Sequence, residues 1–262
     1  MHPIGCAAFD LNLANAVVEQ MVAAFEALKP MPLDAANVAT IPAAPGVYQL
    51  LHRQQLVYVG QAEGSLRERL DRHRVTLSGR KGLDITDMSY RALIVNRNWS
   101  TLATEQALLS HYGRSASWNN SGFGSNDPGR NRDHTAEKAA HFNLKHPIDL
   151  TVGAPQVVVS ETHARVVLIR LKEQSPFIVR FDESALSSLE GVDLELPPSA
   201  TIEQVLQRVG EALGHDWQVS ALPGRVLIYP ERGVSYPNAS VVWPTAPAKG
   251  KKASRKSPKR RR

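Results

Sequence analysis

The sequence predicts an α/β protein with a small mixed or antiparallel sheet flanked by helices, a smaller C-terminal α/β unit and a disordered basic tail. Three observations lead to this expectation. Short β-branched and aromatic runs alternate with segments whose apolar residues recur every three or four positions. The charge balance changes near residue 155, which separates two such series. The chain ends in a run rich in Lys and Arg.

Residues 1–150 are expected to form the first domain, which begins with a helix. Apolar residues at spacings of three and four predict that helix over Asp10–Leu28, and a Pro- and Ala-rich connector follows over 30–45. Two short apolar runs, Gly46–Leu51 and Leu56–Gly60, then predict a β-hairpin.

The rest of the first domain contains three helices, one strand and a long loop. Ser65 and Glu68 form a capping-box pattern, which places a helix start at Ser65, and Ser100 or Thr101 can cap a later helix. The expected elements are a helix over 65–75, a strand over Ser89–Val95, a helix ending at Tyr112, a loop over 113–133 and a short helix over 135–144.

Residues 155–232 predict a small α/β domain of unknown role. Thr201 and Gln204 cap a helix with one apolar face, which ends at Gly214. The expected strands are Arg165–Leu171, Phe177–Phe181, Val192–Leu196, Trp217–Ala221 and Arg225–Tyr229. Residues 233–262 are rich in Pro, Ala, Ser and Lys and are expected to be a disordered basic tail.

The net charge of +6 is distributed unevenly along the chain. Nine of the 31 basic residues lie in 249–262, which has no acid, so the other 22 face 25 acidic residues. Residues 46–132 hold twelve basic and seven acidic side chains, whereas residues 155–232 hold seven basic and eleven acidic ones. This pattern indicates a polyanionic partner for the middle of the chain and the tail, and a protein partner or a supporting role for the acidic unit.

The cysteine content and the hydropathy exclude several classes of protein. Cys6 is the only cysteine, so neither an internal disulfide nor a cysteine zinc site can form. The sequence shows no secretion signal and no apolar run of about 20 residues that could span a bilayer. We therefore expect a cytoplasmic protein.

Two helices carry polar side chains close to an apolar face. Glu105 lies inside the stripe formed by Leu102, Leu109 and Tyr112. A carboxylate facing a core is costly unless it is paired or binds a metal, although a lone glutamate is more often solvated or salt-bridged.

Arg69 and His73 are one turn apart on the earlier helix, near the face marked by Leu66 and Leu70. Taken alone, such a pair is more often the solvated edge of a helix.

An ordered set of motifs changes the interpretation of these residues. Gly46-Val47-Tyr48 opens one predicted strand and Tyr58-Val59-Gly60 closes the next, and the Arg, the His and the Glu follow in order, before Trp118-Asn119. This set resembles the GIY-YIG nuclease superfamily. Downstream, Gly122-Phe123-Gly124 and Asp127-Pro128-Gly129 are similar to the branch of type II restriction endonucleases that cut CCGCGG.

The resemblance implies a catalytic set, which is Tyr48, Tyr58, Arg69, His73, Glu105 and Asn119. Tyr48 would act as the general base or orient the water, and His73 would accept its proton. Arg69 would bind the scissile phosphate, and Asn119 would support the site. Glu105 would hold one Mg²⁺, because a single carboxylate favours one ion over a two-metal site.

The resemblance also implies a partner, double-stranded DNA, and a homodimer on symmetric sites. Arg130 and Arg132 could contact DNA phosphates. Three alternatives stay open at this point: a GIY-YIG nuclease of repair or of mobile elements, a non-catalytic DNA-binding module, and an interaction protein whose main function lies in residues 155–232.

Overall fold

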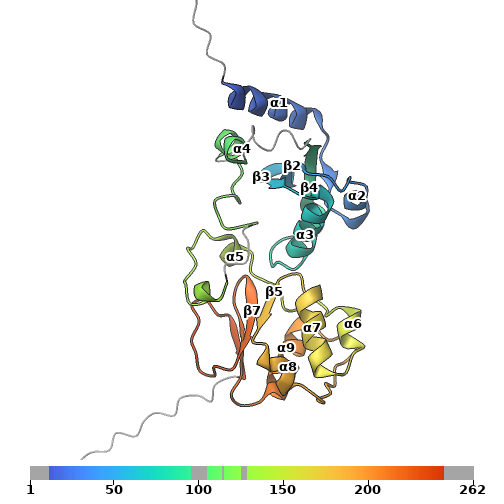
Figure 1. Cartoon of the computed structure of the whole chain (residues 1–262), viewed down its shortest axis with the longest axis vertical. Coiled ribbons are helices and arrows are strands. Elements are labelled where there is room, and N and C mark those ends of the chain that lie inside the picture. Colours follow the sequence, from blue (N-terminus) through green and yellow to red (C-terminus); the bar gives the residue numbers. More distant parts are fainter. Residues whose placement is uncertain (1–11, 96–104, 114, 125–128, 245–262) are drawn as a thin grey trace, which may run out of the picture.

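The computed structural model describes residues 12–95, 105–113, 115–124 and 129–244, and it confirms the expected α/β class. The described elements form two units, placed one above the other in Figure 1, and each unit is built on a four-stranded sheet. Cys6 and the basic segment 249–262 lie outside the described residues. None of the described helices is long and apolar enough to cross a membrane.

The first unit contains an antiparallel sheet with the strand order β1-β4-β2-β3. Its strands are β1 (Met31–Pro32), β2 (Gly46–His52), β3 (Gln55–Ala62) and β4 (Met88–Ile94). β2 and β3 form the expected hairpin around Arg53 and Gln54, whose φ angles are 50° and 66°. Positive φ at both central residues is typical of the tight turns that match the twist of paired strands.

The segment 30–45 is not the plain connector that the sequence suggested. It contributes β1, which pairs with β4, and the short helix α2 (Ala35–Ala39), capped by Asp34. Leu33 and Val38 are buried in the same core as the first sheet. Neither element is long enough to show a hydrophobic period, so the pattern of the sequence could not indicate them.

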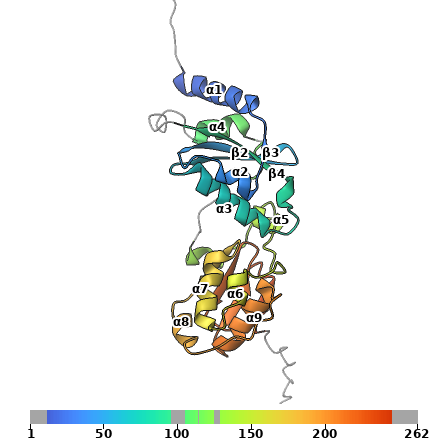
Figure 2. The same cartoon turned by 90° about the vertical axis from the view of Figure 1, so that its right-hand side faces the viewer.

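Helices cover both faces of the first sheet, as Figure 2 shows. α1 (Leu13–Ala27) and α4 (Glu105–Tyr112) lie on one face, and α2 and α3 (Leu66–Ser78) lie on the other. Because strand side chains alternate, Val47 and Val59 pack toward α1 and α4, while Tyr48 and Tyr58 pack toward α3. The predicted helix ending at Tyr112 is present from Glu105 onward, and its expected caps lie outside the described residues.

The second unit places helices against a sheet with the order β5-β7-β6-β8, in which β5 and β7 are parallel. Its strands are β5 (Ile178–Phe181), β6 (Gln218–Ala221), β7 (Arg225–Tyr229) and β8 (Val241–Trp243). Its helices are α6 (Gln156–Val159), α7 (Ala164–Gln174), α8 (Ser184–Ser188) and α9 (Ile202–Leu213). The predicted capping box at the start of α9 and the predicted hairpin of β6 and β7 are both confirmed.

Two of the strands expected in this unit are wrong. Arg165–Leu171 lies in α7, where Ala164, Val167, Leu168 and Leu171 are buried at helical spacing. The β-branched content of the segment favoured a strand, but burial of one face at a 3.6-residue period outweighs that propensity. Val192–Leu196 forms only an isolated bridge, between Asp193 and His163.

The segment expected to be disordered from residue 233 onward is folded in its first part. β8 pairs with β6, and Trp243 is buried in the second core. Tyr236 is buried against Leu227 and Tyr229 in a small separate cluster. The described part of the second unit therefore extends to residue 244. The short helix expected over 135–144 is reduced to α5 (Phe142–Lys145).

A buried carboxylate joins the two units. Asp133 is 1% exposed, and both of its oxygens accept hydrogen bonds from Nη1 of Arg180, each at 2.8 Å. Nε of Arg225 donates to the same carboxylate at 2.8 Å, and Nη2 of Arg225 donates to the carbonyl of Arg132. Asp133 ends the long loop of the first unit, and the two arginines lie on β5 and β7.

Asp133→Ala is expected to lower the free energy of unfolding by about 3 kcal/mol, because it leaves Arg225 buried without its carboxylate. Urea unfolding followed by circular dichroism measures the change. Asp216→Ala is the matched control, since the Asp216 side chain is 93% exposed and its loss should change stability by less than about 0.5 kcal/mol. Equal stability of the two variants would show that the buried network does not hold the units together.

Candidate active site

Tyr48 lies in the middle of β2 and is fully buried. It is paired in register with Gly60 of β3, and its ring covers that glycine. A Cβ atom at position 60 would lie 2.4 Å from the Tyr48 hydroxyl and 2.5 Å from Cζ. The glycine of the second motif is therefore needed so that the tyrosine of the first can lie across the strand pair.

The Tyr48 hydroxyl connects two residues of α3. It lies 2.7 Å from Nε2 of His73, and Nε of Arg69 donates to it at 3.2 Å. The second tyrosine, Tyr58, has its ring 6.0 Å from that of Tyr48 and 5.5 Å from that of His73. The structure thus brings together four of the six predicted catalytic side chains.

Burial sets the protonation states of this group. It lowers the pKa of His73 to about 3, with further lowering by the charges of Arg69 and Arg72. Burial also raises the pKa of the Tyr48 hydroxyl well above its usual value, and Tyr58 adds to this, while the hydrogen bond from Arg69 opposes it. At neutral pH the imidazole and the tyrosine are therefore both neutral. In the tautomer whose single N–H hydrogen lies on Nδ1, Nε2 accepts a hydrogen bond from the Tyr48 hydroxyl.

The depressed pKa of His73 predicts a loss of stability in acid. Between pH 6.5 and about 3 the unfolded chain binds a proton at His73 that the folded protein does not. The stabilising contribution of the neutral, buried His73 to the free energy of unfolding is fully present above pH 6.5. It falls by at most about 1.4 kcal/mol for each pH unit below that value. His73→Gln should flatten the pH dependence of urea unfolding in this window. His215→Gln is the control, because His215 is exposed; unchanged slopes in both variants would contradict the burial of a neutral imidazole.

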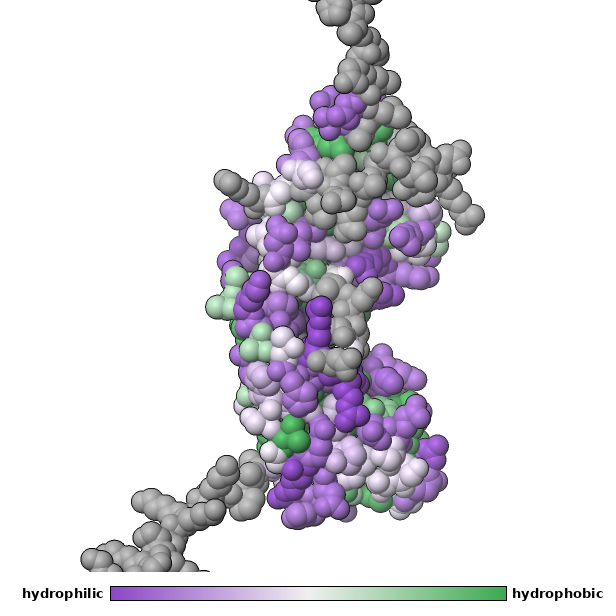
Figure 3. Space-filling model, turned by 60° about the vertical axis from the view of Figure 1, so that its left-hand side comes forward, coloured by the Kyte–Doolittle hydropathy of each residue, from purple (hydrophilic) through white to green (hydrophobic). Residues whose placement is uncertain are grey.

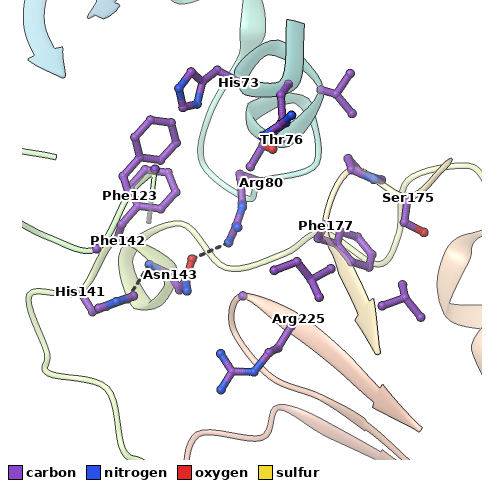
Figure 4. A pocket seen from close by; sticks show the side chains of 18 of the residues that line it. His73, Thr76, Arg80, Phe123, His141, Phe142, Asn143, Ser175, Phe177 and Arg225 are labelled. Carbon is purple, nitrogen blue, oxygen red and sulfur yellow. Dashed lines mark hydrogen bonds between the residues drawn. The ribbon is translucent and has the colours of Figure 1, made fainter. Parts of the chain in front are cut away.

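A loop that the sequence did not place in the site completes it. Phe123 stacks on His73 with ring centroids 5.0 Å apart and meets the Tyr58 ring edge-on at 5.0 Å. The carbonyl of Gly124 accepts a hydrogen bond of 3.1 Å from Nη2 of Arg69. Gly122 and Gly124 both have positive φ, and this glycine pattern was the available signal. Figure 4 shows Phe123 beside His73 at one end of a cleft.

Asn119 lies beside the site and not among the reacting groups. Its Oδ1 accepts from the backbone nitrogen of Val59 at 2.9 Å, and its Nδ2 donates to the Val59 carbonyl at 2.7 Å. β3 is an edge strand, so the Asn119 amide pairs with backbone groups of Val59 on the side of β3 that has no neighbouring strand. The predicted supporting hydrogen bond is therefore present, and Asn119 fixes the strand that carries Tyr58.

The two arginines predicted to bind DNA have different surroundings. Arg130 lies 4.4 Å over the ring of Tyr229 and pairs with Glu231 at 3.5 Å, both residues of the second unit. Arg132 is exposed and lines the cleft between the units. Arg132 thus lies at the cleft, whereas Arg130 contacts residues of the second unit.

Glu105 is the first residue of α4, but its side chain lies outside the part of the structure that is described. The described site residues provide hydroxyl, imidazole, guanidinium and amide groups, and among them no carboxylate. Across the described residues, no three His, Cys, Asp or Glu side chains come close enough to hold a metal ion. α4 packs on the face of the sheet opposite Tyr48 and Tyr58, so the described residues do not place a carboxylate for a hard divalent cation beside them.

The buried Tyr48 hydroxyl lies between a neutral histidine and an arginine. Such a group can move a proton beside a bound anion, which the hydrolysis of a phosphodiester requires. Residues 50–148 match the family model described as the Eco29kI GIY-YIG domain, a family of type II restriction endonucleases. The match spans less than half of the chain and begins two residues after Tyr48. It supports a nuclease, and an endonuclease in particular. No curated protein was found to match the chain.

Proposed function

We propose that the protein is a divalent-metal-dependent endonuclease that hydrolyses phosphodiester bonds in double-stranded DNA, as a cytoplasmic type II restriction enzyme of a restriction-modification system. The observation that carries this proposal is the hydrogen-bonded group of Tyr48, His73 and Arg69, which spans the start of the segment that matches a restriction nuclease family. The basic charge of residues 46–132 suits a polyanionic substrate.

In the proposed reaction Tyr48 passes a proton from the attacking water to His73. The hydroxyl lies 2.7 Å from Nε2 of His73 and accepts from Arg69. With the imidazole hydrogen on Nδ1, the hydroxyl donates to Nε2, so its oxygen can take a proton of the water as its own proton moves to the imidazole. Burial opposes this transfer in the free protein, because it lowers the pKa of the accepting His73 and raises the pKa of Tyr48. A phosphate anion bound at Arg69 would raise the pKa of the imidazole and so favour the transfer. Neither group has to ionise before the substrate binds.

Arg69 is proposed to bind the scissile phosphate. It is half-buried at the edge of the cleft, and its guanidinium is held by the Tyr48 hydroxyl and the Gly124 carbonyl. A fixed guanidinium can stabilise negative charge that develops on the phosphate without reorganising. Tyr58, packed between His73 and Phe123, is proposed to hydrogen-bond the nucleophile or the phosphate.

One Mg²⁺ per site is proposed to bind Glu105. When bound, a divalent cation supplies electrostatic stabilisation of the leaving oxygen. The single carboxylate of the predicted set is the reason for proposing one ion.

The function is tested by digesting a long DNA with the purified protein and Mg²⁺, with EDTA in a parallel reaction, and sequencing the ends. Discrete fragments with a shared end sequence, lost in EDTA, are expected. The family resemblance makes CCGCGG the first sequence to look for. Cleavage of branched duplexes but not of linear ones would instead support a repair nuclease, and no cleavage of any DNA would sink the proposal.

A homodimer on DNA is expected, because each active site serves one strand of a symmetric sequence. Light scattering with a duplex that contains the cleaved sequence should give two subunits per duplex. The opposite finding would be a one-to-one complex that makes double-strand breaks in a single turnover.

A further inference from the structure

A cleft between the two units begins at the proposed active site. Its volume is about 930 Å³, and Figure 4 shows side chains of both units around it. Arg69, His73 and Phe123 lie at one end, and the turn between α7 and β5, with Ser175 and Phe177, forms the opposite wall. The active site therefore opens toward the second unit.

Besides Arg69 of the proposed active site, the arginine and lysine side chains that line the cleft fall into two groups. Arg80 and Arg225 are buried and serve the structure: Nη1 of Arg80 donates to Asn143 and to the carbonyls of His146 and Pro223, while Arg225 is held by the buried carboxylate between the units. Burial lowers the pKa of Arg80 to about 10, which leaves it charged at neutral pH.

The second group is exposed and consists of Arg72, Arg132 and Lys172. None of the three forms an ion pair with another described residue. Arg72 lies on α3 and Lys172 near the end of α7, so free positive charge faces the cleft from both units. These side chains are available to an anionic ligand.

Acidic side chains oppose this charge only weakly. Two carboxylates line the described part of the cleft, and Glu137 is 3.3 Å from Nε2 of His141. The other, Glu173, is the only acid of the second unit among the lining residues. The acidic balance of residues 155–232 therefore does not describe the surface that this unit turns toward the active site.

The surface around the cleft is not an apolar docking surface for another protein. Among the residues that the structure describes, the large exposed apolar side chains are scattered over different elements, and Ile178 is the only one of them that lines the cleft. Figure 3 shows a mostly hydrophilic surface on the face that it presents, with isolated apolar residues. Charge, and not apolar area, distinguishes the cleft.

We propose that the cleft binds the phosphodiester backbone of one DNA strand next to the scissile phosphate, and that Lys172 of the second unit contacts one of its phosphates. The volume of the cleft lies at the upper end of the range for small-molecule sites. It therefore suits a short stretch of one strand and not a whole duplex. The second unit is then one wall of the substrate groove. This inference rests on the proposed nuclease function.

Lys172→Met tests the contact, because it keeps a long side chain over the Phe181 ring, where Nζ now lies 5.0 Å from the centroid, and removes the charge. Anisotropy with a fluorescent duplex containing CCGCGG, in the full-length protein, should show an affinity roughly fivefold lower at low salt. The slope of log affinity against log salt should fall by roughly 0.9, as for the loss of one phosphate contact. Lys172→Arg, which keeps the positive charge, should restore affinity.

Arg208→Ala is the matched control, since Arg208 lies on α9, outside the cleft, and its side chain is 58% exposed. Equal affinities and salt slopes for Lys172→Met and Arg208→Ala, with normal binding by the wild type, would overturn the groove and leave the nuclease function standing. A wild-type protein that neither binds nor cuts duplex DNA would overturn the proposed function itself. A different result would assign the cleft to a small anion instead: inorganic phosphate competes with the duplex for the wild-type protein, while Lys172→Met leaves duplex affinity unchanged.

Discussion

Tyr48→Phe is expected to slow single-turnover DNA cleavage by about 10³-fold, which is the order of a lost general base. The variant keeps the ring that covers Gly60, so the strand pair should remain intact. It removes the hydroxyl that lies within hydrogen-bond distance of both His73 and Arg69 and that can exchange a proton with water. Duplex affinity should change little, because the positive charges around the site are unaffected.

The variant will also lose some stability. Nε2 of His73 is left buried without its partner, which costs about 1–3 kcal/mol. Tyr90→Phe is the matched control: Tyr90 is buried in the same core, and its hydroxyl donates to the Asn37 carbonyl at 3.3 Å, away from the site. A Tyr48→Phe protein that cuts DNA within about tenfold of the Tyr90→Phe rate, while folded, would remove the tyrosine from the reaction.

The parts of the site that the sequence could predict are those fixed by local geometry. The hairpin register places Tyr48 opposite Gly60, and a capped helix places Arg69 and His73 one turn apart. Both follow from short-range patterns, the period of strands and the capping box. The order of the motifs was therefore enough to predict that these four side chains, Tyr48, Tyr58, Arg69 and His73, lie close together.

The parts that the sequence could not predict depend on contacts between distant segments. Phe123 meets His73 only because the loop after α4 folds back over α3, and the chain direction there is set by two glycines with positive φ. Asp133 and Arg225 are 92 residues apart in the chain. No hydrophobic periodicity indicates such a contact, and the net negative charge of residues 155–232 gave no sign that Lys172 lies at the cleft.

The wrong prediction of a strand over Arg165–Leu171, which lies in α7, has a related cause. Its Val and Ile residues favour a strand locally, but the second sheet has its four strands elsewhere, and α7 packs on that sheet with one buried face. Tertiary burial thus decided between two states that local propensity could not separate. The outcome matters for function, because a helix ending near residue 174 brings Lys172 to the cleft.

Glu105→Gln is expected to reduce cleavage by at least ~10³-fold while DNA binding is retained. The amide keeps the size of the side chain and removes the charge proposed to hold a divalent cation. Duplex affinity should stay the same or increase, because a carboxylate near the phosphate repels it.

Three measurements on one preparation of Glu105→Gln separate the metal role from a structural one: melting temperature, duplex affinity and the dependence of cleavage on Mg²⁺ concentration. Asp71→Asn is the control, since Asp71 is a partly exposed acid on α3 that pairs with Arg74 at 2.8 Å, and its loss should leave cleavage near the wild-type rate. If Glu105 were only a buried ion-pair partner, its loss would lower the melting temperature, and the remaining cleavage would follow the folded fraction. A folded Glu105→Gln protein that cuts DNA at the rate of Asp71→Asn, with the same Mg²⁺ dependence, would remove this carboxylate from the site and with it the proposed metal.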